Sequence, residues 1–202
     1  MMTSMASRQL VLASASPARL RLLWDAGFDP MVVVSGVDES EVENGDPAEV
    51  VETLARRKAI AVASIAPSDA LVVGCDSMLS LEGDLLGKPA TSERAREYWQ
   101  RMRGRDGVLL TGHCVFDTAT GRESSAIART TVHFGAPTDD EVDAYIATGE
   151  PLNVAGAFTL DGFAAPFVEG IEGDHGNVIG LSLPLLRKLL ADLDIRITDL
   201  WR

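Results

Sequence analysis

Residues 71–89, LVVGCDSMLSLEGDLLGKP, constrain the fold most, because they join an apolar strand directly to polar side chains. Leu71-Val72-Val73 is a short apolar run, which predicts a buried strand, and Gly74 breaks that run. Asp76 and Ser77 follow where the strand is expected to end. A rigid strand would hold this carboxylate in place, and the glycine would let a substrate approach the backbone closely.

Later in the same stretch, Gly87-Lys88-Pro89 adds one cation on a loop that proline stiffens. An acid, a hydroxyl and a lysine this close in sequence could together hold a metal ion and a phosphate. The alternative is a plain strand, a hairpin turn at Glu82-Gly83-Asp84 and an incidental lysine. This stretch alone leaves both interpretations open.

The charge of the chain limits its partners. Among 202 residues there are 18 Lys and Arg against 30 Asp and Glu, which gives a net charge of −12. Nucleic acids and anionic membranes attract basic surfaces, so we expect neither as a partner. A small anionic substrate is compatible with this charge, because local basic residues dominate the field within a Debye length of about 8 Å.

The two cysteines, Cys75 and Cys114, form no CxxC pair, which argues against a zinc ribbon or a thioredoxin-like site. A reduced, cytoplasmic setting is the simpler interpretation, although the sequence leaves a disulfide open. No apolar run approaches the ~18 residues of a membrane span. Residues 1–8 are expected to be a disordered start, and the apolar run after Arg8 is too short for a signal peptide.

The first predicted strand and helix suggest an anion site. A short strand over residues 10–13 leads into Ser14-Ala15-Ser16 and a helix over residues 17–26. Serine before the first-turn proline is a typical helix start, and Gly27 provides the stop. Backbone N–H groups, two serine hydroxyls and Arg19 would then gather at one helix N-terminus, which suits an anion. The alternative is an ordinary capped helix with solvated arginines.

Helices and strands alternate early in the chain and strands cluster later, so we expect a single mixed α/β domain over residues 9–202. Two charged groups lie among these elements: Asp38-Glu39 after the second strand, and Arg56-Arg57-Lys58 in mid-helix, which is most simply a solvated face. The other expected strands cover residues 29–34, 107–117, 122–134 and about 167–171. The other expected helices cover residues 47–66, 92–102, 139–148 and 183–193, with loops at 40–45 and 172–174.

Several common catalytic motifs do not occur in the sequence. Gly83-x-x-x-Gly87-Lys88-Pro89 is one residue too short for a P-loop, and its proline replaces the Ser or Thr that would hold magnesium. No GxSxG elbow surrounds any serine. The histidines His113, His133 and His175 show no metal-binding spacing. Cys75 is more simply a small core residue than a nucleophile.

Taken together, these segments resemble the Maf family of nucleoside triphosphate pyrophosphatases. The motifs occur in the family's order and cover roughly residues 9–191, so the set is far more specific than any one motif. They are LASASPAR (12–19), Asp38-Glu39, ARRKA (55–59), GCDS (74–77), Gly87-Lys88-Pro89, Thr111-Gly112, Gly149-Glu150-Pro151, AGAF (155–158), Gly173-Asp174 and VIGL (178–181).

The resemblance implies an elongated, mixed-sheet α/β fold, similar to that of the inosine triphosphatases, with a nucleotide cleft between two lobes. It implies cytoplasmic hydrolysis of a nucleoside triphosphate to the monophosphate and pyrophosphate, as house-cleaning of non-canonical nucleotides. A divalent cation, expected to be Mg²⁺, would be the cofactor, and a homodimer is compatible with the family. The retained acids and lysines disfavour one alternative, a nucleotide-binding regulator of septum formation with little hydrolytic activity. A phosphatase that releases orthophosphate would use the same charges, and only the identity of the product separates it.

By the same resemblance, Asp76 matches the family's proton acceptor, and Glu39 with Asp76 would hold the metal ion. Triphosphate hydrolysis needs cations that reduce the repulsion between an anionic phosphate and the attacking water. Oxygen ligands suit Mg²⁺, and a carboxylate beside the ion could deprotonate or orient the water. The substrate-binding residues implied by the resemblance are Ser14, Ser16, Arg19, Lys58 and Lys88.

Three further positions, Ala18, Ser77 and Asp161, match the residues that set base preference in the family. The branch acting on dTTP and UTP usually has Arg, Thr and Gln there, and the branch acting on 7-methyl-GTP has Trp, Gln and Glu. This chain fits neither set, and Asn153-Val154 also departs from the Asp-Lys of the first branch. Asp161 could accept hydrogen bonds from a guanine edge, whereas Ala18 offers no polar contact. We therefore expect a broad or unusual base specificity.

Overall fold

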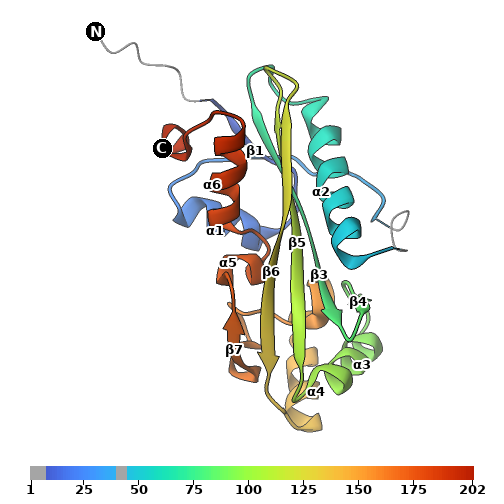
Figure 1. The fold of residues 1–202 in the computed structure, drawn as a ribbon. Helices are drawn as coiled ribbons and strands as arrows, with labels where there is room; N and C mark the ends of the chain where they lie inside the picture. The colour runs from blue at the N-terminus through green and yellow to red at the C-terminus, as the bar shows by residue number, and fades with distance from the viewer. Residues whose placement is uncertain (1–7, 40–44) are drawn as a thin grey trace.

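The computed structural model describes residues 8–39 and 45–202, which form an elongated molecule around one long sheet (Figure 1). Its strands are β1 (Leu10–Leu12), β2 (Met31–Val32), β3 (Leu71–Leu81), β4 (Asp84–Leu86), β5 (Asp106–Asp117), β6 (Glu123–Phe134) and β7 (Val168–Glu172). These seven strands follow the order β2-β1-β3-β5-β6-β7, with β4 paired to β3. β1 runs parallel to β2 and β3, and the other pairs are antiparallel, so the predicted mixed sheet is confirmed.

Helices cover this sheet differently at its two ends. The α-helices are α1 (Pro17–Asp25), α2 (Pro47–Ala63), α3 (Ser92–Met102), α4 (Asp139–Ala147), α5 (His175–Ile179) and α6 (Leu183–Asp192), and the 3₁₀ turns are η2 (Glu150–Asn153), η3 (Ala155–Ala157), η4 (Ala165–Phe167) and η5 (Ile197–Leu200). In Figure 1, α2 lies on one side of the upper part of the sheet and α1 and α6 on the other, and α3 and α4 lie at the lower end. We call the end with α1, α2 and α6 the first lobe and the end with α3 and α4 the second lobe.

Side chains that start the helices explain several of these boundaries. Ser16, Asp46 and Ser182 each accept a backbone N–H at a helix start that has proline in its first turn. Thr138 and Glu141 form the predicted capping box of α4, in which each side chain bonds the other residue's backbone. These boundaries were predictable because the signal lies within four residues of the helix start.

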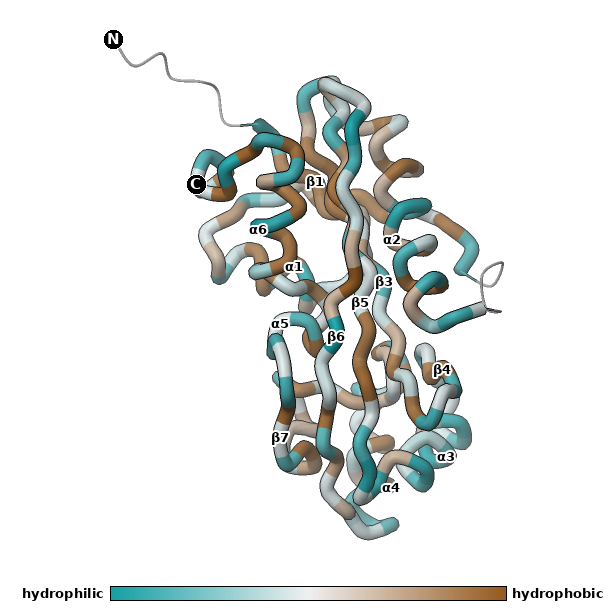
Figure 2. Tube along the Cα trace, viewed as in Figure 1, coloured by the Kyte–Doolittle hydropathy of each residue, from teal (hydrophilic) through white to brown (hydrophobic). Residues whose placement is uncertain are grey.

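The long strand β3 carries two separate hydrophobic cores on one face. Successive side chains of a strand face opposite sides of the sheet. Leu71 and Val73 pack with α1 and α6, and Leu79, farther along the same face, packs with α3 and α4. Figure 2 shows the hydrophobic stretches along the central strands and the helices beside them. Ser77 lies on this face between the two cores, so the lobes meet where β3 turns polar.

On the other face, the backbone of α2 packs directly onto the sheet at two glycines. A Cβ on Gly74 would lie less than 3.0 Å from the carbonyl oxygen of Ala55, and one on Gly112 less than 3.0 Å from that of Val51, closer than real Cβ atoms come. Gly112 lies directly opposite Asp76 in the β3–β5 register. Only glycine permits this approach, which places α2 beside the carboxylate of Asp76.

Some predicted boundaries were wrong, for physical reasons. The strand expected to end at Gly74 continues to Leu81, because this glycine admits a helix and does not break the strand, so Asp76 lies inside β3. The second strand is limited to Met31–Val32, whose side chains are both exposed at the sheet edge. The helix α5 was missed, since its five residues are too few to show a helical period.

Two predicted segments, the disordered start and the first loop, lie largely outside the described residues. Residues 1–7 of the expected disordered start, and 40–44 of the expected loop, are not among them. Arg8 is described, and it donates hydrogen bonds to the carbonyl oxygen of Asp69 and to the carboxylate of Asp117. Within residues 8–39 and 45–202, no helix combines the length and the apolar character that a membrane span requires.

Asp117 closes the β5–β6 hairpin, and its carboxylate is only 3% exposed. It accepts hydrogen bonds from Arg8, from the hydroxyl of Thr120 at 2.9 Å and from the backbone N–H of Ala119 at 2.9 Å. Burial alone would raise the pKa of this carboxyl, but the hydrogen bonds outweigh burial and lower the pKa to about 2. The fold therefore depends on the ionised form of Asp117.

We expect Gly112→Ala to lower the free energy of unfolding by about 3 kcal/mol, the upper end of typical overpacking costs, because the new methyl would overlap the backbone of α2. Urea unfolding would measure this loss. Gly87→Ala is the matched control, since a Cβ there has nothing within 4 Å and should be nearly neutral. If Gly112→Ala were as stable as wild type, the close approach of α2 would not need the glycine.

We expect Asp117→Asn to be less stable than wild type in a pH-dependent way. The folded pKa of about 2 lies below the usual value of about 3.9 in an unfolded chain. The carboxylate therefore contributes about 2 kcal/mol above roughly pH 4, and loses this contribution as the pH falls toward 2. Unfolding free energies measured from pH 6 downward should show the gap between the two proteins narrowing.

The control for this prediction is Asp84→Asn, because Asp84 forms an exposed ion pair with Arg101. Exposed pairs contribute roughly 0–1 kcal/mol, so this variant should stay close to wild type. A gap between wild type and Asp117→Asn that did not change with pH would contradict the role of the ionised carboxylate.

Candidate active site

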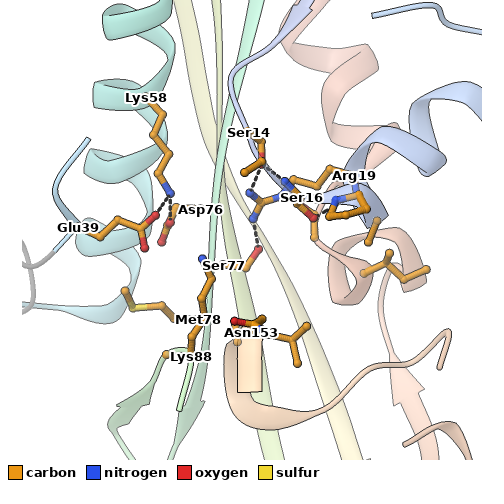
Figure 3. A pocket seen from close by; sticks show the side chains of 18 of the residues that line it. Ser14, Ser16, Arg19, Glu39, Lys58, Asp76, Ser77, Met78, Lys88 and Asn153 are labelled. Carbon is orange, nitrogen blue, oxygen red and sulfur yellow. Dashed lines mark hydrogen bonds and ion pairs between the residues drawn. The ribbon is translucent and has the colours of Figure 1, made fainter. Parts of the chain in front are cut away.

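A cleft of about 540 Å³ opens beside the middle of β3 and is lined by residues of both lobes, as predicted. Its lining includes every predicted site residue: Ser14, Ser16, Ala18, Arg19, Glu39, Lys58, Asp76, Ser77, Lys88 and Asp161. In Figure 3, Lys58, Asp76 and Glu39 lie together on one side, and Ser14, Ser16 and Arg19 lie on the other. Elements far apart in the sequence therefore meet here.

Lys58 joins two carboxylates at one wall of the cleft. Its Nζ lies 2.6 Å from Asp76 Oδ1 and 2.6 Å from Glu39 Oε1. Lys58 and Asp76 are 6% and 5% exposed, so this pair is almost entirely removed from water. The solvated-face interpretation of the basic run fits Arg56 and Arg57, which are exposed, and is wrong for Lys58.

The pKa values of the two carboxyls shift in opposite directions. Burial raises the pKa of Asp76, and it outweighs the attraction of Lys58 and Arg19. Burial also acts to raise the pKa of Glu39, but the hydrogen bond and charge of Lys58, with Lys88 and Arg19, lower it overall. Asp76 is therefore the more basic group, and Glu39 stays ionised over a wider pH range.

The second carboxylate oxygen of Asp76, Oδ2, is buried and has no hydrogen-bond partner among the described residues. Buried polar atoms are nearly always paired with protein, water or an ion. A divalent cation that takes oxygen ligands from Asp76 and Glu39 would satisfy this atom. No group of three or more Asp, Glu, His or Cys that could hold a metal occurs in residues 8–39 and 45–202. Phosphate oxygens and water would thus complete the coordination, which suits Mg²⁺.

Arg19 turns its guanidinium inward toward the sheet. Nε donates to the carbonyl oxygen of Gly180 at 2.8 Å, and Nη2 donates to Ser77 Oγ at 2.9 Å. Nη1 donates to Ser14 Oγ at 3.1 Å and to the carbonyl oxygen of Cys75 at 3.0 Å. These bonds use all but one of its N–H groups. Arg19 is therefore a fixed cation that ties α1 to β3 and to the segment after α5.

The start of α1 provides the predicted hydroxyls. Ser16 is the N-cap, and its Oγ accepts the backbone N–H of Arg19 at 3.4 Å. Ser14 Oγ accepts the backbone N–H of Ser16 at 3.1 Å, and Ser14 is 7% exposed. The partly positive N-terminal end of the helix thus borders the cleft, next to Arg19.

The remaining predicted residues lie around the rim and floor. Lys88 is exposed, and its positive charge helps to lower the pKa of the Glu39 carboxyl. Asp161 lies on the second-lobe side, and its Oδ2 is 3.8 Å from Nη1 of Arg21, a pairing that sequence reasoning missed. Ala18 contributes no polar atom, as expected.

Two further residues support the lining of the cleft, although neither was predicted to belong to the site. Glu150 Oε1 accepts the Thr159 hydroxyl at 2.5 Å and the backbone N–H of Phe163 at 3.0 Å, which fixes the loop that carries Asp161. Thr111 is fully buried and contacts Ser77. Glu150 and Thr111 both lie in motifs of the resemblance, so this signal could have found them.

The buried cysteine beside the site does not belong to the chemistry. Cys75 is free and buried, and burial raises the pKa of its thiol to about 11. The thiol is thus protonated at neutral pH, and the prediction of a core residue is confirmed. The apolar part of the cleft includes Val154, Phe158, Leu160, Val178 and Ile179, a lining that suits a flat nucleobase.

Comparisons with known proteins find similar sequences that share one description. A protein described as "Nucleoside triphosphate pyrophosphatase" from Streptomyces coelicolor is 63% identical, covering 99% of this chain and 98% of its own. Proteins of the same description from Streptomyces avermitilis and Salinispora tropica are 59% and 57% identical, covering 99% and 96% of this chain and 98% and 87% of their own.

One solved structure, of a HAM1 protein from Coxiella burnetii, covers 92% of this chain and 99% of its own at 14% identity. Its TM-score of 0.47 is too low to support an inference. The family model described as "Maf-like protein" matches residues 9–193, which is nearly the whole chain. Together with the relatives above half identity, this match shows that the chain belongs to the Maf family.

Proposed function

We propose that this chain is a nucleoside triphosphate pyrophosphatase, which hydrolyses an NTP or dNTP to the monophosphate and pyrophosphate. The observation that carries the proposal is the buried Lys58–Asp76 pair, in which Asp76 keeps one unpartnered oxygen inside a cleft lined by basic residues. Relatives above half identity that carry this description support it. A protein that only binds nucleotide would not need a buried carboxylate with an open oxygen.

Cations in the cleft match the charge of a triphosphate. Lys58, Lys88 and Arg19 border one cavity, and the start of α1 adds its partial positive charge. Because Arg19 is held by several hydrogen bonds before any ligand arrives, its charge needs no reorganisation during the reaction. These groups would lower the repulsion between the phosphates and an attacking water.

Asp76 is the proposed general base. In the protein without a bound cation, burial raises the pKa of this carboxyl, and Oδ2 is its one oxygen without a protein partner. Oδ2 would therefore be the atom that faces the cation and orients or deprotonates a water bound to it. A positioned general base is typically worth ~10²–10⁴-fold in rate. Lys58, held on Oδ1, fixes the orientation of the carboxylate.

The proposed cofactor is Mg²⁺, which Asp76 and Glu39 would hold together with substrate oxygens, and which would neutralise phosphate charge when bound. The apolar part of the cleft would take the base, with Ala18, Ser77 and Asp161 setting its preference. Asp161 is paired with Arg21, so a base edge must compete with a guanidinium for this carboxylate. We further propose cytoplasmic house-cleaning of non-canonical nucleotides and a homodimeric state.

The experiment for this proposal is a panel assay with Mg²⁺. Canonical, methylated and deaminated triphosphates would be incubated with the purified protein, and pyrophosphate and orthophosphate measured separately. We expect equal amounts of pyrophosphate and monophosphate without orthophosphate. Orthophosphate as the first product would contradict the proposal. A folded protein that binds nucleotide without turnover would favour the septum-regulator alternative.

We expect Asp76→Asn to lower kcat by ~10²–10⁴-fold at every Mg²⁺ concentration, because it removes the proton acceptor. Glu39→Gln should instead raise the Mg²⁺ concentration for half-maximal activity, by about tenfold, and recover most of kcat at saturating metal. A Mg²⁺ titration of both variants would thus separate loss of the proton acceptor, which saturating Mg²⁺ does not rescue, from loss of a residue that only holds the metal ion. Asp143→Asn, at an exposed ion pair far along the chain, is the surface control. A folded Asp76→Asn protein with the wild-type kcat would refute the assignment.

A further inference from the structure

Behind the cleft, a row of hydroxyl groups connects Arg19 to a fully buried threonine. Thr111 lies on β5 directly opposite Ser77 on β3. Its Oγ1 is 2.9 Å from Ser77 Oγ and 3.2 Å from the carbonyl oxygen of Asn177, and Thr111 is 0% exposed. Ser77 Oγ in turn receives Nη2 of Arg19 at 2.9 Å.

The groups at the two ends of the row decide which group donates in each of these hydrogen bonds. A carbonyl oxygen can only accept, so the single hydroxyl hydrogen of Thr111 goes to Asn177. Ser77 must therefore donate its own hydrogen to Thr111, which leaves its lone pairs for Arg19. Since a guanidinium can only donate, the whole row runs in one sense from Arg19 to Asn177.

We infer that Thr111 is a positioning residue, which orients the Ser77 hydroxyl so that a lone pair faces Arg19 and thereby fixes the guanidinium at the cleft wall. Without Thr111 Oγ1, the Ser77 hydrogen would lose its buried acceptor and could rotate toward the guanidinium, which needs an acceptor there. The effect on substrate rests on the proposed function, because it requires Arg19 to face a bound triphosphate.

Loss of the Thr111 hydroxyl should affect the chemical step less than binding, because the charge of Arg19 stays in the cleft and Asp76 lies on the other face of the strand. Asp76 and Ser77 are neighbours in β3, so their side chains face opposite sides of the sheet. Lys58 contacts Asp76 on the α2 side, whereas Thr111 contacts Ser77 on the side of α1 and α5. Loss of the Thr111 hydroxyl should therefore weaken substrate binding more than it slows kcat.

The first test is steady-state kinetics of Thr111→Val, which keeps the side-chain shape and removes the hydroxyl. We expect KM for a triphosphate to rise about tenfold, the size of one lost hydrogen bond to a charged group, with kcat within about threefold of wild type. Thr111→Ser, which restores the hydroxyl, should recover most of the loss. Wild-type KM in Thr111→Val would overturn the inference.

Thr130→Val is the matched control. Thr130 is 1% exposed, donates to the carbonyl oxygen of Asp174 at 3.0 Å and accepts from Nδ2 of Asn177 at 3.0 Å. Thr130 is thus a comparable buried threonine beside α5, and it does not contact Ser77. The KM of Thr130→Val should therefore match that of wild type. An equal rise of KM in both valine variants would reduce Thr111 to a structural residue and overturn the inference.

A second measurement needs no substrate and can be made on a Thr111→Val protein that is too unstable for kinetics. The unfolding equilibrium constants of Thr111→Val, Arg19→Lys and their double variant would be compared in urea. If Thr111 acts on Arg19 through Ser77, the double effect should fall short of the product of the single effects by at least about fivefold. Effects that simply multiply would overturn the inference, whereas absence of hydrolysis by wild type would count only against the proposed function.

Discussion

The contact between the backbone of α2 and the backbones of β3 and β5 is the constraint on which the rest of the site depends. Two glycines, Gly74 and Gly112, remove the side chains that would otherwise hold the helix away. The helix then places Lys58 in an almost fully buried position, where an ammonium group is stable only with charged partners. Asp76 and Glu39 are those partners, so close packing and charge pairing specify the same arrangement.

The alternation of side chains along one strand separates the site into two parts. The side chain of Asp76 faces α2 and bonds Lys58. The side chain of Ser77 faces α1 and accepts a hydrogen bond from Arg19. The backbone of β3 joins the two parts, the charge of Arg19 acts on both carboxyls, and both parts border the same cleft because the strand passes between the lobes there. A strand that crosses a lobe boundary can therefore present chemistry from both of its faces to one ligand.

Local signals explain how much of this could be predicted from the sequence. Helix starts at Ser16 and Thr138 depend on neighbouring residues, and the chosen site residues do line one cleft. Gly74 was misjudged because a glycine that admits a helix backbone looks the same in sequence as one that ends a strand. The pairing of Thr111 with Ser77 depends on the register of two strands, which no local pattern contains.

The ion-pair partners of the charged residues were also not predictable from the sequence. Lys58 lies in a basic run whose other members are exposed, and only the position of α2 over the glycines distinguishes it from them. The pairing of Arg21 with Asp161 likewise joins α1 to a loop from the second lobe. Both cases depend on distances between elements that are far apart in the chain.

The row of hydroxyls has a consequence for the ligand itself. Ser77 gives its only hydrogen to Thr111 and receives one from Arg19, so the group it turns to the cleft is a lone pair. In hydrogen-bonding terms this serine behaves like a carbonyl oxygen. The carboxylate of Asp161 lines the same cavity, so a nucleobase edge that meets Ser77 and Asp161 must bring the hydrogens.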